Sequence, residues 1–154
     1  MIVVCAWLVH SISWFLPVIK LDGKHGAAYE PLRGWIAFRA ALSPVLPYGD
    51  LHVDTWYHVV FSTLSAVTTL LFVLGSPWVA WFGSRRLQTA CAFVAASAFI
   101  FNSYWYVLFH SDKALSIGYF LWLLSFALLS AGLFGLSSYC VAEKSGQANR
   151  AETN

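Results

Sequence analysis

The chain alternates between long stretches without charged side chains and short polar segments. The charge-free stretches are Met1–Ile19, Thr55–Ser84, Leu87–Ser111 and Ala114–Ala142. All nine Lys and Arg residues and all seven Asp and Glu residues lie between or after them. Because a helix rises about 1.5 Å per residue, roughly 20 apolar residues cross a bilayer core. The pattern predicts an all-α membrane protein, an up-down bundle of four transmembrane helices at about residues 2–19, 56–74, 87–109 and 115–141.

The long connection between the first two predicted spans contains a further helix. Residues 31–43 predict it, because Pro31 suits a first helical position and Pro44 stops the run. Its apolar side chains fall on one broad face, which predicts an interfacial helix lying on the bundle or the bilayer surface. Arg39 falls inside that apolar face, so we expect it to reach a lipid phosphate or to pair with a carboxylate.

The remaining boundaries follow from proline, glycine and polar residues. The first helix is expected to run to about Ile19, with Pro17 loosening its last turn. The second is expected to break at residues 75–78, which read Gly-Ser-Pro-Trp. Residues 1–142 are predicted to form one four-helix domain, and the polar residues 143–154 a disordered tail.

Composition narrows the class of protein. Hydrophobic residues make up 59%, charged residues 10%, and the mean hydropathy is +0.66, whereas a soluble domain carries about 25% charged residues. The net charge of +2 is too small to indicate a nucleic-acid partner, so the lipid bilayer is the predicted environment. Cys5, Cys91 and Cys140 form no CxxC pair and fall on one side of the predicted bundle, which is typical of filler thiols in a reduced compartment.

Small residues in the fourth predicted span indicate a helix contact. Gly118, Ser125 and Gly132 recur every seven residues, which keeps one seam against a partner helix. Ala131 and Gly135 form a second pair on a neighbouring stripe. A different polar signal is Asn102, a carboxamide inside the third predicted span, which needs a partner and should face another helix.

Several imidazole and carboxylate groups gather near the ends of two predicted spans. His52, Asp54 and His58 precede or open the second span, and His110 closes the third. Such groups would suit a zinc, copper or iron site, or proton exchange at a membrane surface, and they also occur as solvated boundary residues. The chain has no HExxH motif and no repeated ligand spacing, so no cofactor is predicted.

His10 lies in the middle of the first predicted span, and an ionisable group at that depth is a functional candidate. One hydrogen bond to a hydroxyl of the second span would satisfy a neutral imidazole. Bis-histidine haem ligation would need a second histidine at matching depth, and the chain offers none.

Three short aromatic-rich segments occur along the chain: residues 13–18 read SWFLPV, residues 34–38 read GWIAF and residues 118–125 read GYFLWLLS. Over residues 13 to about 135 the chain resembles a widespread group of uncharacterised small bacterial membrane proteins with four helices. It departs from that group at residues 60–63, which read Val-Phe-Ser-Thr where the group often has Trp-Ala-Asn-Pro. The resemblance implies a four-helix fold in a bacterial cytoplasmic (inner) membrane and implies no activity.

Positive charge and cysteine position bear on orientation. The count of Lys and Arg is close on the two sides of the predicted bundle. Arg85 and Arg86 sit together at a span end, and with the thiols they favour cytoplasmic N- and C-termini, with the reverse orientation as the alternative.

Three functions fit these features. The favoured one is a structural or accessory subunit of a membrane assembly, or a homo-oligomer, which the small-residue seams support. The second is an oligomeric small-molecule or ion carrier, whose polar path would use His10, Asn102 and the hydroxyls of the second span. The third is a membrane enzyme or metal-binding protein that uses the His/Asp group.

Overall fold

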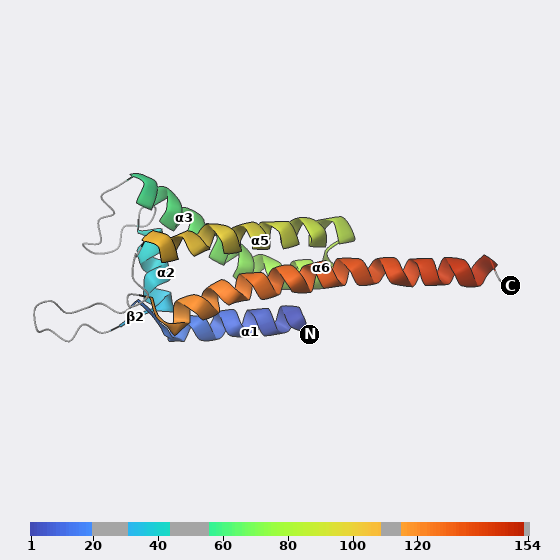
Figure 1. Cartoon of the computed structure of the whole chain (residues 1–154), viewed down its shortest axis with the longest axis horizontal. Coiled ribbons are helices and arrows are strands. Elements are labelled where there is room, and N and C mark those ends of the chain that lie inside the picture. The colour runs from blue at the N-terminus through green and yellow to red at the C-terminus, as the bar shows by residue number, and fades with distance from the viewer. Residues whose placement is uncertain (20–30, 44–55, 109–114, 153–154) are drawn as a thin grey trace, which may run out of the picture.

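The computed structural model of the protein describes residues 1–19, 31–43, 56–108 and 115–152, and most of them are helical (Figure 1). In chain order the elements are α1 (Ile2–Phe15), β1 (Pro17–Ile19), β2 (Leu32–Arg33), α2 (Gly34–Leu42), α3 (Trp56–Leu70), the π-helical turn η1 (Leu71–Gly75), α4 (Ser76–Phe82), α5 (Arg85–Leu108) and α6 (Ile117–Glu152). Along the chain, α1, α3–α4, α5 and α6 run in alternating directions (Figure 1).

Three helical segments are long and apolar enough to cross a membrane: Trp56–Phe82, Arg85–Val107 and Ile117–Ser138. These segments confirm the predicted helical class and indicate a membrane protein. Five of their six ends lie within three residues of the predicted spans, and the exception is the end of the second span, where the helix continues to Phe82.

The first helix is shorter than predicted, because α1 ends at Phe15 and not near Ile19. Pro17 restricts the residue before it, and Leu16 is extended, with φ −89° and ψ 154°. The 14 residues of α1 span roughly 21 Å, less than the bilayer core of about 30 Å. The chain beyond Leu16 forms β1 instead of a last helical turn.

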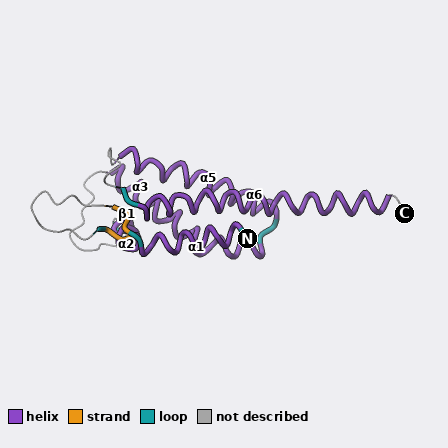
Figure 2. The backbone as a smooth tube through the Cα atoms, turned by 60° about the horizontal axis from the view of Figure 1, so that its bottom comes forward, coloured by secondary structure: helices purple, strands orange, loops and turns teal. Residues whose placement is uncertain are grey.

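A small antiparallel sheet ties three elements together at one end of the helices (Figure 2). It consists of β1 and β2, and backbone bonds extend it in both directions. The Gly34 amide at the start of α2 donates to the Leu16 carbonyl at 3.1 Å, and the Ser116 amide just before α6 donates to the Val18 carbonyl at 2.8 Å. The end of α1 and the starts of α2 and α6 are therefore held in one unit.

The predicted short helix is present as α2, three residues shorter at its start and one at its end than residues 31–43. It lies crosswise over the ends of the longer helices (Figure 1) and contacts α1 and α3. Phe38 on α2 stacks on Trp14 of α1, with ring centroids 5.2 Å apart. Its position at a membrane interface stays a prediction.

The predicted break at residues 75–78 was wrong, because η1 carries the helix through into α4. Pro77 lacks the amide hydrogen that would bond to the Val73 carbonyl four residues earlier. The π-helical turn lies where that bond is missing. The indole Nε1 of Trp7 on α1 donates to the Val73 oxygen at 3.4 Å. A side chain from a neighbouring helix thus donates to the carbonyl that has no backbone donor because of the proline. Such replacement bonds are usual for prolines in membrane helices.

The predicted disordered tail also differs from the structure, in which α6 continues as a helix to Glu152 and projects beyond the other helices (Figure 1). Residues 142–152 contain Ala, Glu, Lys, Gln and Arg, which have high helix propensity, and no proline. The predicted domain end at residue 142 therefore falls inside a continuous helix.

α6 packs against α1 on one side and α5 on the other, and the core forms around it. The largest fully buried apolar side chains are Phe126 and Leu133 of α6. Buried alanines of the neighbouring helices let the backbones approach them. They are Ala6 of α1 and Ala92, Ala95 and Ala98 of α5.

The seven-residue seam of α6 lies against α1 and the start of β1. A Cβ added at Gly118 would stand 2.6 Å from the Pro17 carbonyl oxygen, and one at Gly132 would stand 2.9 Å from Val3 Cγ2. Ser125, between them, is completely buried and bonds to α1. The second small pair differs: Ala131 and Gly135 are exposed, and apart from the backbone of α6 itself and the two chain neighbours, no described atom lies within 4 Å of a Cβ built at Gly135.

This difference predicts opposite effects of one substitution at two sites of the same helix. Gly118→Ala should lower the free energy of unfolding by about 1–3 kcal/mol, because its methyl group meets backbone oxygens that cannot rotate away. Gly135→Ala should leave stability unchanged or raise it by up to about 1 kcal/mol through helix propensity. Thermal unfolding of both variants in detergent measures this, and equal midpoints would show that the seam makes no close contact.

Candidate functional site

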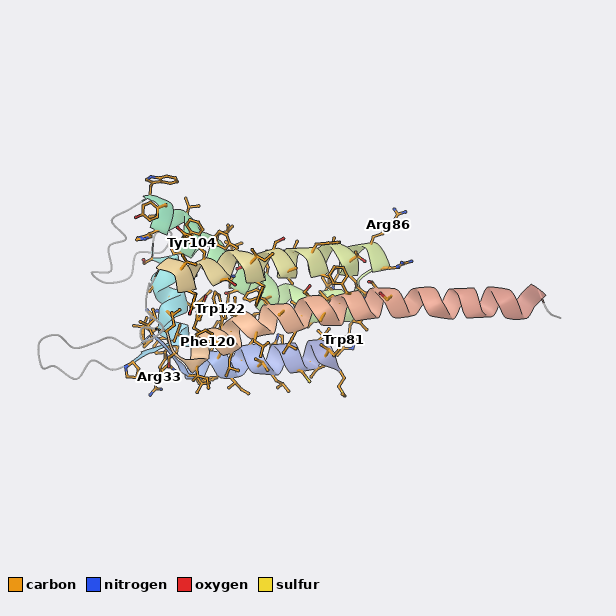
Figure 3. The ribbon with its side chains drawn as sticks, viewed as in Figure 1. Arg33, Trp81, Arg86, Tyr104, Phe120 and Trp122 are labelled. Carbon is orange, nitrogen blue, oxygen red and sulfur yellow. The ribbon has the colours of Figure 1, made fainter. Side chains whose placement is uncertain are left out.

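A cavity of about 620 Å³ lies where α2 crosses the ends of the other helices. We call it the α2 cavity. Its walls come from the end of α1, β1, α2, α3, the end of α5 and the start of α6. Trp122 of α6, one of its lining residues, lies near α2 in Figure 3. The volume is within the range of about 300–1,000 Å³ that is typical of small-molecule sites.

The α2 side of the cavity is formed mainly by residues with little or no side chain. Gly34, Ala37, Ala40 and Ala41 all line it. A Cβ at Gly34 would stand 2.5 Å from the Ser13 carbonyl oxygen, so this glycine lets α2 lie close to α1. The alanines have only methyl groups to extend from the helix, which leaves the space open.

One wall of the cavity is polar. His58, Ser62, Ser65 and Thr69 line it, and their spacing of four, three and four residues places them on one face of α3. We call this set the α3 polar stripe. The sequence shows the hydroxyls of this span, but their continuation to His58 at helical spacing is the signal that sequence reasoning missed.

The other lining surfaces carry large rings, which we call the aromatic wall. It consists of Trp14, Phe38, Trp105, Tyr119 and Trp122. The Trp14 and Phe38 planes lie within 28° of parallel, and the centroids of Tyr119 and Trp122 are 6.0 Å apart. A cavity with one polar face and aromatic sides suits a molecule that is mostly apolar and carries a few hydrogen-bonding groups.

Asn102 lies behind the polar stripe and is completely buried. Its Oδ1 accepts from Ser65 Oγ at 2.6 Å, and its Nδ2 donates to Thr68 Oγ1 at 3.3 Å, so it faces α3. Ser65 also accepts from Trp105 Nε1 at 2.9 Å, and Tyr119 donates its hydroxyl to the Asn102 carbonyl at 2.9 Å. The carboxamide thus joins α5 to α3. The Ser65 hydroxyl holds the Trp105 ring, and the backbone carbonyl of Asn102 holds the Tyr119 ring of α6.

His10 is 2% exposed, and its partner is on α6 instead of the second span. Its Nδ1 lies 2.9 Å from Ser125 Oγ, and that hydroxyl gives its hydrogen to the Trp122 carbonyl at 2.6 Å. Because the serine hydrogen is already used, Nδ1 is the donor in this bond. A charged imidazole buried among apolar side chains would be costly, so the ring is neutral and its Nε2 is a bare acceptor. Within the described residues Nε2 has no partner, and the ring stacks on Phe72 with centroids 4.2 Å apart.

Only His58 of the four metal candidates lies in the described part of the chain, where it is half-buried and lines the α2 cavity. His52, Asp54 and His110 lie outside the described residues, so their convergence stays a prediction. Among the residues that are described, no three His, Cys, Asp or Glu side chains could hold a metal ion together.

Arg39 is exposed, with its guanidinium carbon 5.9 Å from the centre of the Trp35 ring. This cation–π contact is an arrangement that the sequence did not predict. Both side chains lie on α2, and neither lines the α2 cavity, so the charge is kept away from that space.

Comparisons of the chain with protein-family models, with curated proteins and with solved structures found no match. The geometry of the α2 cavity is therefore the strongest indication of function.

The His10–Ser125 bond gives a prediction for stability. Ser125→Ala should cost about 1–3 kcal/mol, because it removes the acceptor of a buried donor. Ser138→Ala is the matched control on the same helix: Ser138 is exposed, and its hydroxyl bonds to the Phe134 carbonyl one turn away. Unfolding in detergent measures both, and an equal loss in the two variants would contradict the assigned role of Ser125.

Proposed function

We propose that this chain is a four-span protein of the bacterial cytoplasmic membrane that binds a lipophilic small molecule in the α2 cavity. The single observation that carries the proposal is a cavity of about 620 Å³ with aromatic sides and one polar face. A molecule that partitions into the bilayer would find apolar surface for its body and hydroxyl groups for its polar atoms.

The fourth span in this proposal is α1 together with β1. The helix provides roughly 21 Å of length, and residues 16–19 add about 13 Å in extended form. Their sum exceeds a bilayer core of about 30 Å. Non-helical backbone at that depth needs internal partners, and the Leu16 and Val18 carbonyls have them in Gly34 and Ser116. These features support an up-down bundle of four spans.

α2 in this arrangement is the interfacial helix. It lies across the helix ends and exposes Trp35 and Arg39, which suit the boundary between hydrocarbon and headgroups. The α2 cavity then lies just beneath that boundary.

The opposite end of the bundle supports cytoplasmic termini. The N-terminus, Trp81 and Arg86 all lie at the end away from α2 (Figures 1 and 3). Arg85 and Arg86 are exposed there, as positive residues are on the cytoplasmic side, and Trp78 and Trp81 suit an aromatic belt.

A second candidate role is that of an accessory subunit or homo-oligomer. The observation in its favour is the exposed pair Ala131 and Gly135 on α6, whose small size would let a partner helix approach. This role uses a different surface from the α2 cavity, and the two are compatible.

Filling the cavity should abolish binding. We expect wild-type protein purified from native membranes in mild detergent to carry a co-purifying lipophilic molecule at about one per chain by native mass spectrometry. Ala37→Phe places a ring in the α2 cavity and should remove it. Ala90→Phe, at an exposed position of α5, is the control and should retain it. Equal occupancy in both variants, or none in the wild type, would overturn the proposed function.

Topology can be tested separately. Reporter fusions after Asp22, Arg86, Asp112 and Glu143 should lie outside, inside, outside and inside the cytoplasmic membrane in that order. Any other order would contradict either the number of spans or the orientation.

A further inference from the structure

We infer that the ligand of the α2 cavity is a neutral, ring-headed lipid with a carbonyl oxygen that accepts a hydrogen bond from Thr69, which is the chemistry of an alkylated quinone. The inference rests on the proposed function, that this cavity binds a lipophilic molecule, and adds the ligand's chemical class. Three features of the cavity carry it: one uncommitted hydroxyl hydrogen, the absence of charge on the described lining, and the aromatic wall.

The hydroxyl hydrogens of the α3 polar stripe are not equally available. Ser62 donates to a backbone carbonyl of its own helix at 3.1 Å, and Ser65 donates to Asn102 Oδ1 at 2.6 Å. Thr69 is 3% exposed, and its Oγ1 accepts from Trp122 Nε1 at 3.3 Å. Its own hydrogen has no acceptor among the described residues. A buried donor without an acceptor is unfavourable, and a carbonyl oxygen on a bound molecule would satisfy it.

The described lining indicates a neutral ligand. It includes no Lys, Arg, Asp or Glu, and its one titratable imidazole, His58, is at the far end of the α3 polar stripe from Thr69. Eleven residues of helix separate the two, or about 16 Å. A carboxylate or phosphate bound near Thr69 would therefore be buried without a counter-charge, which is costly at membrane depth.

The aromatic wall favours a flat ring as the group that reaches Thr69. The bond from Trp122 Nε1 holds that indole beside the Thr69 hydroxyl, so a ring stacked on Trp122 would have its edge oxygens next to the free hydrogen. Flat rings gain from offset or edge-to-face contact with such side chains. The cavity of about 620 Å³ exceeds the need of one ring, and the alanine side formed by α2 leaves room for the first part of an alkyl tail.

Binding of three probes to the delipidated full chain in nanodiscs tests the inference. The probes are a decyl-substituted benzoquinone, decylbenzene and decanoate, which share a ten-carbon chain and differ in ring, carbonyl and charge. We expect the quinone to bind about 5- to 10-fold more tightly than decylbenzene, the range that one hydrogen bond supplies. Decanoate should bind more weakly than either.

Variants of Thr69 separate the hydrogen bond from general packing. Thr69→Val has the same shape without the hydroxyl and should weaken quinone binding about 5- to 10-fold more than decylbenzene binding, because loss of the Trp122 acceptor affects both rings alike. Thr69→Ser should retain most of the affinity. Thr63→Val is the matched control on α3, because Thr63 does not line the α2 cavity, and it should bind like the wild type.

The outcomes distinguish this inference from the proposed function. Equal binding of the quinone and decylbenzene, both affected equally by Thr69→Val and both lost in Ala37→Phe, would overturn the ring-carbonyl assignment and leave the lipophilic site in place. Quinone binding that Thr69→Val and Thr63→Val weaken equally would also overturn it. Binding that survives Ala37→Phe would overturn the proposed function itself.

Discussion

The close contact of α6 with α1 and with the β1 strand that follows it is the constraint on which the α2 end of the molecule depends. Gly118 has no side chain, so the start of α6 can lie against the Pro17 carbonyl. The same approach brings the Ser116 amide to the Val18 carbonyl and closes the strand unit that positions α2. Because α2 covers the cavity, the shape of the cavity depends on this backbone contact. None of the polar side chains that line the cavity takes part in the contact.

A polar contact fixes the register of the same interface. Small residues allow two helices to approach but do not determine how far one slides along the other. The bond from His10 to Ser125 forms at one register of α1 against α6 and so favours that register. Ser125 in turn bonds to the carbonyl of Trp122, whose indole reaches Thr69. A histidine that does not line the cavity is thereby connected to the orientation of one of its rings.

The sequence predicted the features that depend on nearby residues, namely the long helices and one helix contact. Charge-free stretches located the long helices, and the seven-residue repeat led to Gly118 at a real contact. The end of α1 was missed because Pro17 shows only that a helix weakens, whereas the strand that follows depends on partners at residues 32–33 and at Ser116. The partner of His10 is 115 residues away, among many hydroxyls of equal chemistry. The cavity was missed because it exists where Ala37 and Ala41 have only methyl groups. Such small side chains give no signal of a site in the sequence.

The length of α6 gives the bundle a mechanical property. At about 1.5 Å per residue, the 36 residues of α6 form a rod of roughly 54 Å, well over the thickness of a bilayer core. One end of this rod carries Gly118 and Trp122 beside α2, and the other projects past every other helix (Figure 1). Because the helix is continuous and stiff, a force or torque applied to its projecting end would be transmitted to the wall of the cavity. The helix would pivot where it contacts α1.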